Sequence, residues 1–439
     1  MAYTGDRHCV LVGGNGSGKT RRLLLTNVMR LQSWSTVIVD TKGVLAAITE
    51  GRLKTRRIVI DPFLILGDEG LPFNPIAALN PDSYDFVDDA MLMAESMITL
   101  GEKEPHWGQA AQDFLSGFIM YVRLKYGRDG SMVDVRKLVT LDQANMVKAV
   151  KDMIRTAEIH GCDALTAKVT RLLDWTSENR EISGVMATAI AQTRWIDSPL
   201  ISACMGGDNT IDFASLKDEP TTVFLVLPPA RLRTHAMWMR LMLASILQPL
   251  MKDTRADTVP VLLMLDEFYA IAKGGLPVID DNMAMLREYG IKLWVVLQDL
   301  AQAHMLYGEH GWQSYIANSG VFQSFATNDV ITSKFVSDLS GEFFMKVKGT
   351  SGTIQYTPDG QMTESTGSSV NPTRMPVILP EHARNMDDGY SIVFMNEEKG
   401  HRFTYLPYPT LIPWTAAAMA SDPSAATASS RKQEAPASA

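Results

Sequence analysis

Cysteine is scarce in this sequence, with three among 439 residues. Cys9, Cys162 and Cys204 lie far apart and form no Cys-x-x-Cys pair. This pattern argues against a disulfide framework and against a thiolate metal site, and it is typical of a protein from a reducing compartment. The eight histidines lack the paired spacings that hold zinc on a helix, so the sequence predicts no protein-held zinc.

A long apolar run is also lacking. The most apolar stretch, 236–251, is interrupted by Arg240, Gln248 and Pro249 and is shorter than the roughly 20 residues that a membrane span needs. The first residues have neither the basic start nor the apolar core of a secretory signal. We therefore expect a cytoplasmic chain without a transmembrane segment, and a buried helix at 236–251.

An excess of positive charge is absent as well. The formal net charge is −8, so the chain as a whole does not attract nucleic acid. Any contact with DNA must come from a local basic surface or from a channel that several subunits form. The length and the apolar content of 46% supply more than one small core, which predicts at least two structural units.

Strand and helix patterns alternate at both ends of the chain. Short runs rich in Val, Ile and Leu are typical of strands covered on both faces, and apolar residues at helical spacing separate them. The alternation predicts an α/β fold with a mostly parallel central sheet flanked by helices. The predicted strands are 7–13, 36–40, 57–61, 222–227, 261–265, 292–297 and 321–325.

Between residues 81 and 210 the pattern changes to long amphipathic segments with few β-branched runs. We expect an all-α insertion there, so that 1–80 and 211–414 form the two parts of the sheet domain. The Gly-, Ser- and Thr-rich segment 342–373 predicts a hairpin or excursion at the edge of the sheet. The Ala-, Ser- and Pro-rich tail at 415–439 has little to bury, and we expect it to be disordered.

A glycine-rich loop follows the first predicted strand and precedes a helical pattern. It matches the phosphate-binding consensus Gly-x-x-x-x-Gly-Lys-[Ser/Thr] in full. In such a loop backbone N–H groups surround phosphate oxygens, the lysine reaches the β- and γ-phosphates, and the hydroxyl binds Mg²⁺. Thr20 is therefore a candidate Mg²⁺ ligand. The predicted ATP-binding residues are Gly13, Gly14, Asn15, Gly16, Ser17, Gly18, Lys19 and Thr20.

Two acidic residues end the apolar strand predicted at 261–265. Asp266 would bind the shell of the Mg²⁺, and Glu267 would orient or deprotonate the attacking water. The next strand ends at Gln298, where an amide could sense the γ-phosphate; a polar cap of the strand is the alternative interpretation. The pattern predicts a P-loop ATPase with Lys19, Glu267 and Gln298 as catalytic residues and Asp266 as a second metal ligand.

With these motifs in place, the sequence resembles the TraG/TraD-type coupling proteins of type IV secretion systems, the ATPases of bacterial conjugation. The resemblance runs through nearly the whole chain. It rests on an ordered series of short segments, which is more specific than any one motif. Besides the P-loop these are Val39-Asp40-Thr41-Lys42-Gly43, Asp61-Pro62, Phe73-Asn74-Pro75, Leu265-Asp266-Glu267-Phe268, Arg287-Glu288-Tyr289-Gly290-Ile291, Gln298 and Tyr307-Gly308.

The resemblance implies a RecA-like P-loop NTPase domain, an inserted all-α domain that meets cargo, and a homohexamer with ATP between neighbours. It also implies that Arg287 enters the ATP site of the neighbouring subunit as a catalytic arginine; a salt bridge at a helix end is the alternative. The implied partners are single-stranded, relaxase-bound DNA, relaxase or effector cargo, and the secretion channel. A monomer in the absence of DNA and peripheral attachment at the inner membrane stay open.

The sequence departs from the family pattern in two places. Family members usually begin with transmembrane helices ahead of the P-loop, whereas Lys19 lies near the first residue here. The family's Asp-Pro-Lys-Gly-Glu segment reads Asp40-Thr41-Lys42-Gly43-Val44, so no role of its glutamate is carried over.

The leading hypothesis is an ATP-hydrolysing coupling protein, or DNA translocase, that links relaxase-bound DNA or effector cargo to a type IV secretion channel. A related hexameric DNA pump, for chromosome translocation or virion packaging, is the first alternative. A nucleotide-gated cargo adaptor with little hydrolysis is the second. Fold alone does not separate these three functions.

Overall fold

The computed structural model describes residues 3, 5–67, 70–101, 105–176, 179–208, 211–356, 358–360, 362–387, 390–397 and 400–407. The tail predicted at 415–439 lies outside the described residues. Within the described part of the chain, none of the helices is both long and apolar enough to cross a bilayer.

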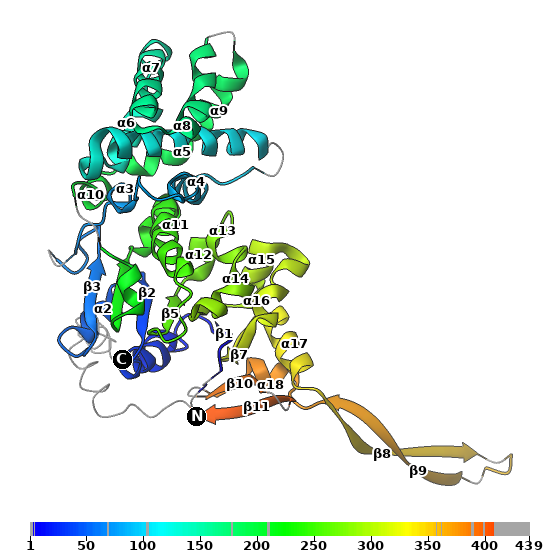
Figure 1. Cartoon of the computed structure of the whole chain (residues 1–439). Coiled ribbons are helices and arrows are strands. Elements are labelled where there is room, and N and C mark those ends of the chain that lie inside the picture. Colours follow the sequence, from blue (N-terminus) through cyan, green and yellow to red (C-terminus); the bar gives the residue numbers. More distant parts are fainter. Residues whose placement is uncertain are drawn as a thin grey trace, which may run out of the picture.

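A nine-stranded sheet forms the centre of the molecule (Figure 1). Its order is β11-β10-β7-β1-β6-β5-β2-β4-β3, and neighbouring strands from β7 to β3 run parallel. β10 and β11 add an antiparallel pair at one edge. The predicted α/β fold with a mostly parallel sheet is confirmed. The strands are β1 (His8–Val12), β2 (Ser35–Asp40), β3 (Arg56–Ile60), β4 (Thr221–Val226), β5 (Val261–Leu265), β6 (Ile291–Leu297), β7 (Ser319–Ser324), β10 (Tyr390–Glu397) and β11 (Gly400–Pro407).

Alternating side chains of these strands divide the core into two layers, one on each face of the sheet. Leu11 and Ile38 belong to the cluster that packs against the helical segments following β1 and β2. Their neighbours Val10 and Val37 belong to the cluster on the other side. Because both faces are covered, the strands contain short apolar runs, such as Val37-Ile38-Val39 and Val223-Phe224-Leu225-Val226, which make them recognisable in the sequence. The covering segments of the first face are η1 (Lys19–Leu24), α1 (Leu25–Arg30) and α2 (Val44–Thr49).

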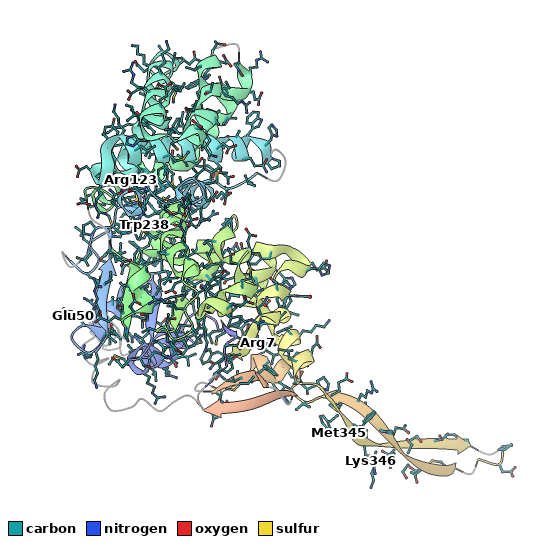
Figure 2. The ribbon with its side chains drawn as sticks, in the orientation of Figure 1. Arg7, Glu50, Arg123, Trp238, Met345 and Lys346 are labelled. Carbon is teal, nitrogen blue, oxygen red and sulfur yellow. The ribbon has the colours of Figure 1, made fainter. Side chains whose placement is uncertain are left out.

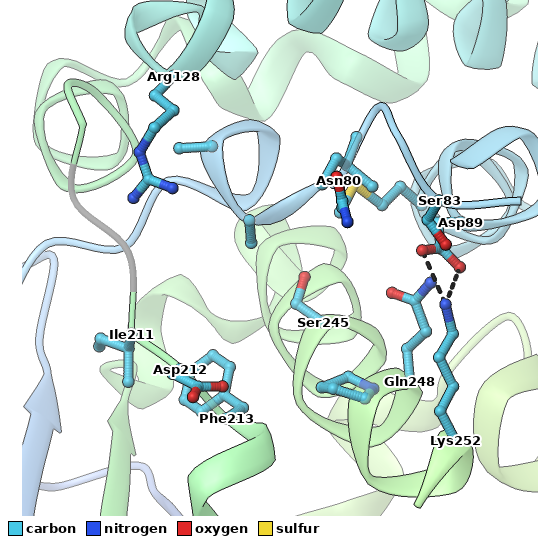
Figure 3. A pocket seen from close by; sticks show the side chains of 15 residues that line it. Asn80, Ser83, Asp89, Arg128, Ile211, Asp212, Phe213, Ser245, Gln248 and Lys252 are labelled. Atoms are coloured by element: carbon cyan, nitrogen blue, oxygen red, sulfur yellow. Dashed lines mark hydrogen bonds and ion pairs between the residues drawn. The ribbon is translucent and has the colours of Figure 1, made fainter. Parts of the chain in front are cut away.

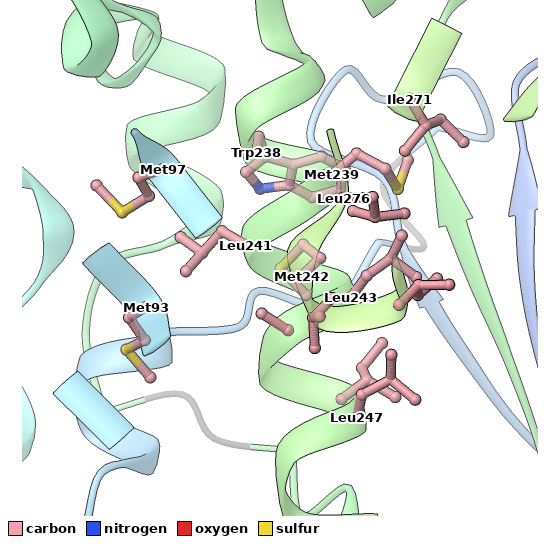
Figure 4. Close-up of a cluster of buried hydrophobic side chains, with 14 of the residues drawn as sticks. Met93, Met97, Trp238, Met239, Leu241, Met242, Leu243, Leu247, Ile271 and Leu276 are labelled. Atoms are coloured by element: carbon pink, nitrogen blue, oxygen red, sulfur yellow. The ribbon is translucent and has the colours of Figure 1, made fainter. Parts of the chain in front are cut away.

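Helices between β3 and β4 form a separate layer that packs along the side of α11 (Pro229–Lys252) (Figure 1). Met93 and Met97 of α4 face Trp238 and Leu241 of α11, and all four side chains are buried (Figure 4). This apolar contact attaches the helical layer to the sheet domain. The helices of the layer are α3 (Pro75–Ala78), α4 (Phe86–Met97), α5 (Pro105–Tyr126), α6 (Met132–Val139), α7 (Gln143–His160), α8 (Asp163–Val169), α9 (Arg180–Thr193) and α10 (Pro199–Cys204).

The chain from Phe268 onward supplies eight helical segments and a long hairpin among the described residues. β8 (Glu342–Tyr356) and β9 (Met362–Pro376) pair with each other as a separate two-stranded sheet, which projects away from the body (Figure 1). The helices are α12 (Phe268–Ala272), α13 (Pro277–Asp280), α14 (Met283–Leu286), η6 (Arg287–Tyr289), α15 (Leu300–Gly311), α16 (Gln313–Ala317), α17 (Val330–Leu339) and α18 (Pro380–Arg384).

Candidate nucleotide site

The glycine-rich loop joins β1 to the helical segment that begins at Lys19. Gly16 and Gly18 have positive φ angles of 82° and 85°, in the left-handed region that residues with a Cβ rarely adopt. A Cβ at Gly13 would lie 2.8 Å from Cδ2 of Phe325. Backbone conformation and close packing therefore require glycine at these positions, and the loop leads directly into a helix N-terminus, the usual place for a phosphate group.

Lys19 lies under the loop with 8% of its surface exposed. Its ammonium donates to the carbonyl oxygens of Gly13 and Gly14. Burial lowers the pKa of Lys19, and the carboxylates of Asp266 and Glu267 act in the opposite direction. A buried cation at the loop and two acids more than 240 positions away in the sequence thus share one electrostatic environment.

The two acids follow the fully buried strand β5. Burial raises the pKa of the Asp266 carboxyl to about 6, the charge of Glu267 adds to the rise, and the Lys19 ammonium opposes it. An Asp266 carboxylate oxygen accepts the backbone N–H of Glu267 at 3.0 Å. A divalent cation bound nearby would favour the ionised form of this carboxyl.

Glu267 has a strained backbone. Its φ of 54° and ψ of 39° lie in the left-handed region, which a glutamate adopts at a cost of about 1–2 kcal/mol. Among the described residues only Leu64 is another non-glycine residue with positive φ. The turn ends β5 and caps α12, and it carries the Glu267 carboxylate to the neighbouring strand end. Strain of this kind is often found at functional sites.

Gln298 is the residue that meets Glu267. Its Nε2 donates to Oε2 of Glu267 at 3.2 Å, and its backbone N–H donates to the side chain of Gln302. The contact arises because β6 lies between β1 and β5, so the carboxyl end of β6 separates the loop from the acids. The acids therefore follow a strand that is not paired with β1. The intervening strand carries the amide instead.

Arg287 lies elsewhere. It begins η6, which precedes β6, so the length of that strand separates it from Gln298. It is exposed, and its charge acts on His8 at the start of β1, where it lowers the pKa of the imidazole after the larger effect of burial. Within one chain, the structure does not bring Arg287 to Lys19, Asp266 and Glu267. A role in a neighbouring subunit stays a prediction.

Three further charged residues lie close to the site without having been assigned a role from the sequence. Asp40 follows the last position of β2's apolar run, is buried, and accepts the backbone N–H of Ala46 at 2.9 Å. Lys42 and Asp299 both act on the pKa of Lys19, with opposite signs. Their position in the sequence could have identified them. Each lies at, or two residues beyond, the carboxyl end of a predicted strand, and these strand ends form the edge of the sheet that also holds Asp266.

A cavity of about 340 Å³ lies away from these residues, between the helical layer and α11 (Figure 3). Gln248 and Lys252 of α11 line it from one side and Asp89 of α4 from the other. The Lys252 ammonium bridges Asp89 at 2.8 Å and Asp85 at 2.9 Å. The cavity belongs to the junction of the two layers and not to the candidate nucleotide site.

The residues at the loop fit a magnesium nucleotide. The donor set is one hydroxyl at Thr20, one carboxylate at Asp266, a buried cation and a loop of backbone N–H groups. Among the described residues no cluster of three or more His, Cys, Asp or Glu could hold a metal ion by itself. Mg²⁺ usually keeps several waters and is bound by one or two protein oxygens together with substrate phosphates, so this sparse set suits it.

Comparison with known proteins places the chain in a family. The model of the family "Type IV secretory system Conjugative DNA transfer" matches residues 2–408. Conjugal transfer protein TraG of Rhizobium radiobacter is 25% identical over 401 residues, which cover 89% of this chain and 60% of that protein. Protein VirD4 of Agrobacterium fabrum is 25% identical over 411 residues, covering 90% and 57%. The chain thus spans about 60% of the length of these relatives.

Solved structures show the same fold. The plasmid coupling protein TrwB in complex with ADP and Mg²⁺ matches with a TM-score of 0.65 at 15% identity, covering 92% of this chain and 85% of that one. The fold is therefore the RecA-like α/β fold of these coupling proteins. With the family match over nearly the whole chain, the conclusion is that the protein belongs to the type IV secretory system conjugative DNA transfer family.

Proposed function

We propose that this chain hydrolyses ATP with Mg²⁺ and uses the energy to deliver DNA, bound to a relaxase, or effector cargo to a type IV secretion channel. The observation that carries the proposal is the meeting of Lys19, Asp266, Glu267 and Gln298 at the carboxyl ends of β1, β5 and β6. Membership of a conjugative DNA transfer family supports DNA as the cargo. The TrwB complexes with nucleotide support ATP as the fuel.

Each residue has a distinct role in hydrolysis. Lys19 and the backbone N–H groups of the loop bind the phosphate oxygens, whose charge grows in the transition state. Glu267 accepts the proton of the attacking water, and the Gln298 amide at 3.2 Å fixes the direction of that carboxylate. Thr20 and Asp266 would hold Mg²⁺, which would supply positive charge to neutralise the phosphates.

Arg287 would complete the site from a neighbouring subunit of a hexameric ring. Its exposure and its place at the opposite end of β6 from Gln298 suit contact with another chain and not with its own site. A guanidinium supplied in this way stabilises the transition state and makes hydrolysis depend on assembly. Mixed rings of Arg287→Ala and Lys19→Ala subunits should therefore recover part of the activity that each variant lacks alone. Failure to recover activity at any mixing ratio would remove the role in trans.

The proposal is tested by steady-state ATP hydrolysis of the purified chain, with and without single-stranded DNA. Lys19→Ala and Glu267→Gln should each lower kcat at least about 100-fold. Lys334→Ala and Glu158→Gln remove the same charges from exposed positions on α17 and α7 and should leave kcat unchanged. Full activity in either variant would contradict the catalytic role of the substituted residue. Nucleotide binding without multiple turnover in the unmodified chain would favour the adaptor function instead.

A further inference from the structure

The β8–β9 hairpin reaches far from the rest of the molecule (Figure 1). Each strand has 15 residues, which corresponds to about 50 Å of extended chain. The two strands form a sheet of their own and are not joined to the central sheet. An isolated two-stranded hairpin is marginally stable in water, so one of this length is expected to serve contact with a partner.

The register separates the side chains of the hairpin by chemistry. Phe344 lies opposite Arg374, Lys346 opposite Pro372, and Lys348 opposite Val370. Alternate residues of a strand share a face, so Phe344, Lys346, Lys348 and Arg374 form one surface, here called the cationic face. The Arg374 guanidinium lies 5.3 Å from the centre of the Phe344 ring. Glu342 approaches Arg374 at 3.7 Å and offsets one of the three positive charges.

The opposite face of the hairpin carries apolar side chains at positions that alternate with those of the cationic face. Phe343, Met345 and Val347 alternate with the residues of the cationic face, and Phe343 pairs with Met375. Figure 2 labels Met345 and Lys346, which are neighbours in sequence and therefore point to opposite sides. One side of the hairpin is thus apolar near its base and the other is basic and aromatic.

We infer that the cationic face binds single-stranded DNA. Phosphate contacts need local positive charge in a chain whose net charge is −8, and Lys346 and Lys348 supply it about 7 Å apart along one strand. Phe344, 66% exposed, offers a ring on which an unpaired base can stack. Base stacking requires bases that are free of a duplex, which selects a single strand.

The arrangement disfavours a membrane as the partner. A hairpin lying on a bilayer would bury the apolar face of Phe343 and Met345, and it would then direct Lys346 and Lys348 away from the lipid headgroups. A polyanion on the cationic face leaves the apolar side available for protein contact. The inference rests on the proposed function for the identity of the cargo, and it adds a place on the chain where the strand is held.

The test measures binding of a fluorescein-labelled oligothymidylate to the full chain by fluorescence anisotropy over a series of salt concentrations. In the triple variant Lys346→Gln, Lys348→Gln, Arg374→Gln, the negative slope of log affinity against log salt should become shallower by about 1.4–2, because each lost phosphate contact to a single strand removes about 0.7 and Glu342 offsets one of the three charges. The matched control changes Lys148, Lys151 and Arg155 to Gln on the exposed side of α7 and should keep the original slope.

A second pair of variants tests stacking. Phe344→Leu should weaken binding roughly five- to 100-fold with little change in the salt slope, since it removes a ring and no charge. Phe343→Leu, on the opposite face, should bind the oligonucleotide as the unmodified chain does. Equal effects of the two substitutions would contradict a role of the cationic face.

Other outcomes overturn the inference in recognisable ways. An unchanged slope in the hairpin triple variant, or an equal loss in the α7 control, shows that the strand is held elsewhere. Altered assembly in light scattering with unaltered oligonucleotide affinity assigns the hairpin to protein contact. Loss of binding to anionic vesicles, with unaltered oligonucleotide affinity, assigns it to a membrane. ATP hydrolysis without DNA should stay normal in the hairpin variants, so a failure here is distinct from a failure of the proposed function.

Discussion

The strained backbone at Glu267 predicts an inversion of the usual order of glycine and alanine. In an ordinary helix glycine is less stable than alanine by about 1 kcal/mol. At Glu267 the φ of 54° penalises every residue with a Cβ by about 1–2 kcal/mol and does not penalise glycine. Glu267→Ala keeps the strain and loses the hydrogen bond from Gln298. Glu267→Gly loses the same bond and releases the strain.

The magnitude follows from the difference between these two variants. The lost hydrogen bond is common to both and cancels. The release of about 1–2 kcal/mol is reduced by the greater freedom of glycine in the unfolded chain, about 0.5–1 kcal/mol. Glu267→Gly should therefore be more stable than Glu267→Ala by roughly 0.8 kcal/mol, the midpoint of the ~0–1.5 kcal/mol that these two ranges span. Both variants should lack ATP hydrolysis, because neither has a carboxylate to accept a proton.

Urea denaturation of the two variants provides the measurement, with ATP hydrolysis as the second assay. Lys151 in the middle of α7 is the matched control, because it is exposed and lies in a regular helix. There the alanine variant should be the more stable by about 1 kcal/mol. Equal stabilities at position 267, or alanine ahead of glycine at both positions, would refute the argument from strain.

Three further predictions concern the site and its surroundings. Gln298→Glu should lower kcat more than Gln298→Ala does, since it places a like charge about where the amide donates to Glu267 at 3.2 Å; equal kcat values would contradict this. Gly13→Ala should lower the free energy of unfolding by about 1–3 kcal/mol through contact with Phe325, whereas Gly14→Ala meets no atom within 4 Å; recovery of that free energy on adding Phe325→Leu checks the cause. Asp197→Asn should destabilise the chain at neutral pH, because it removes the ion pair with Arg136 at 2.7 Å. The loss should be only about 1 kcal/mol, since the Asp197 side chain is more than half exposed. The Arg136 hydrogen bond lowers the pKa of Asp197 below 3.8, so this difference should shrink as the pH falls through that range; a difference independent of pH would refute the pairing.

The strands of the sheet could be predicted because burial on both faces leaves an unbroken apolar run in the sequence. β5 begins and ends where the pattern placed it, and β2 and β6 begin one residue earlier. Apolar runs carry no information on which strands are neighbours. The place of β6 between β1 and β5, and with it the meeting of Gln298 and Glu267, therefore needed the structure.

Other features had weak or misleading signals. β10 and β11 were not predicted, although β10 lies inside the sheet between β7 and β11 and carries the apolar run Ile392-Val393-Phe394-Met395, which the sequence analysis did not use. The 342–373 segment was expected as a hairpin or excursion at the sheet edge, and its register instead defines one long separate ribbon. The left-handed turn at Glu267 has no signature in the sequence, since glutamate is not a residue that favours that conformation.

The central claim is that the glycine-rich loop and the distant acids bind one magnesium nucleotide. Calorimetric titration with ADP, in the presence and absence of Mg²⁺, tests it most directly. The account predicts that Mg²⁺ strengthens ADP binding to the unmodified chain and that this gain is lost in Asp266→Asn, while Lys19→Ala weakens binding under both conditions. An undiminished gain from Mg²⁺ in Asp266→Asn would contradict it.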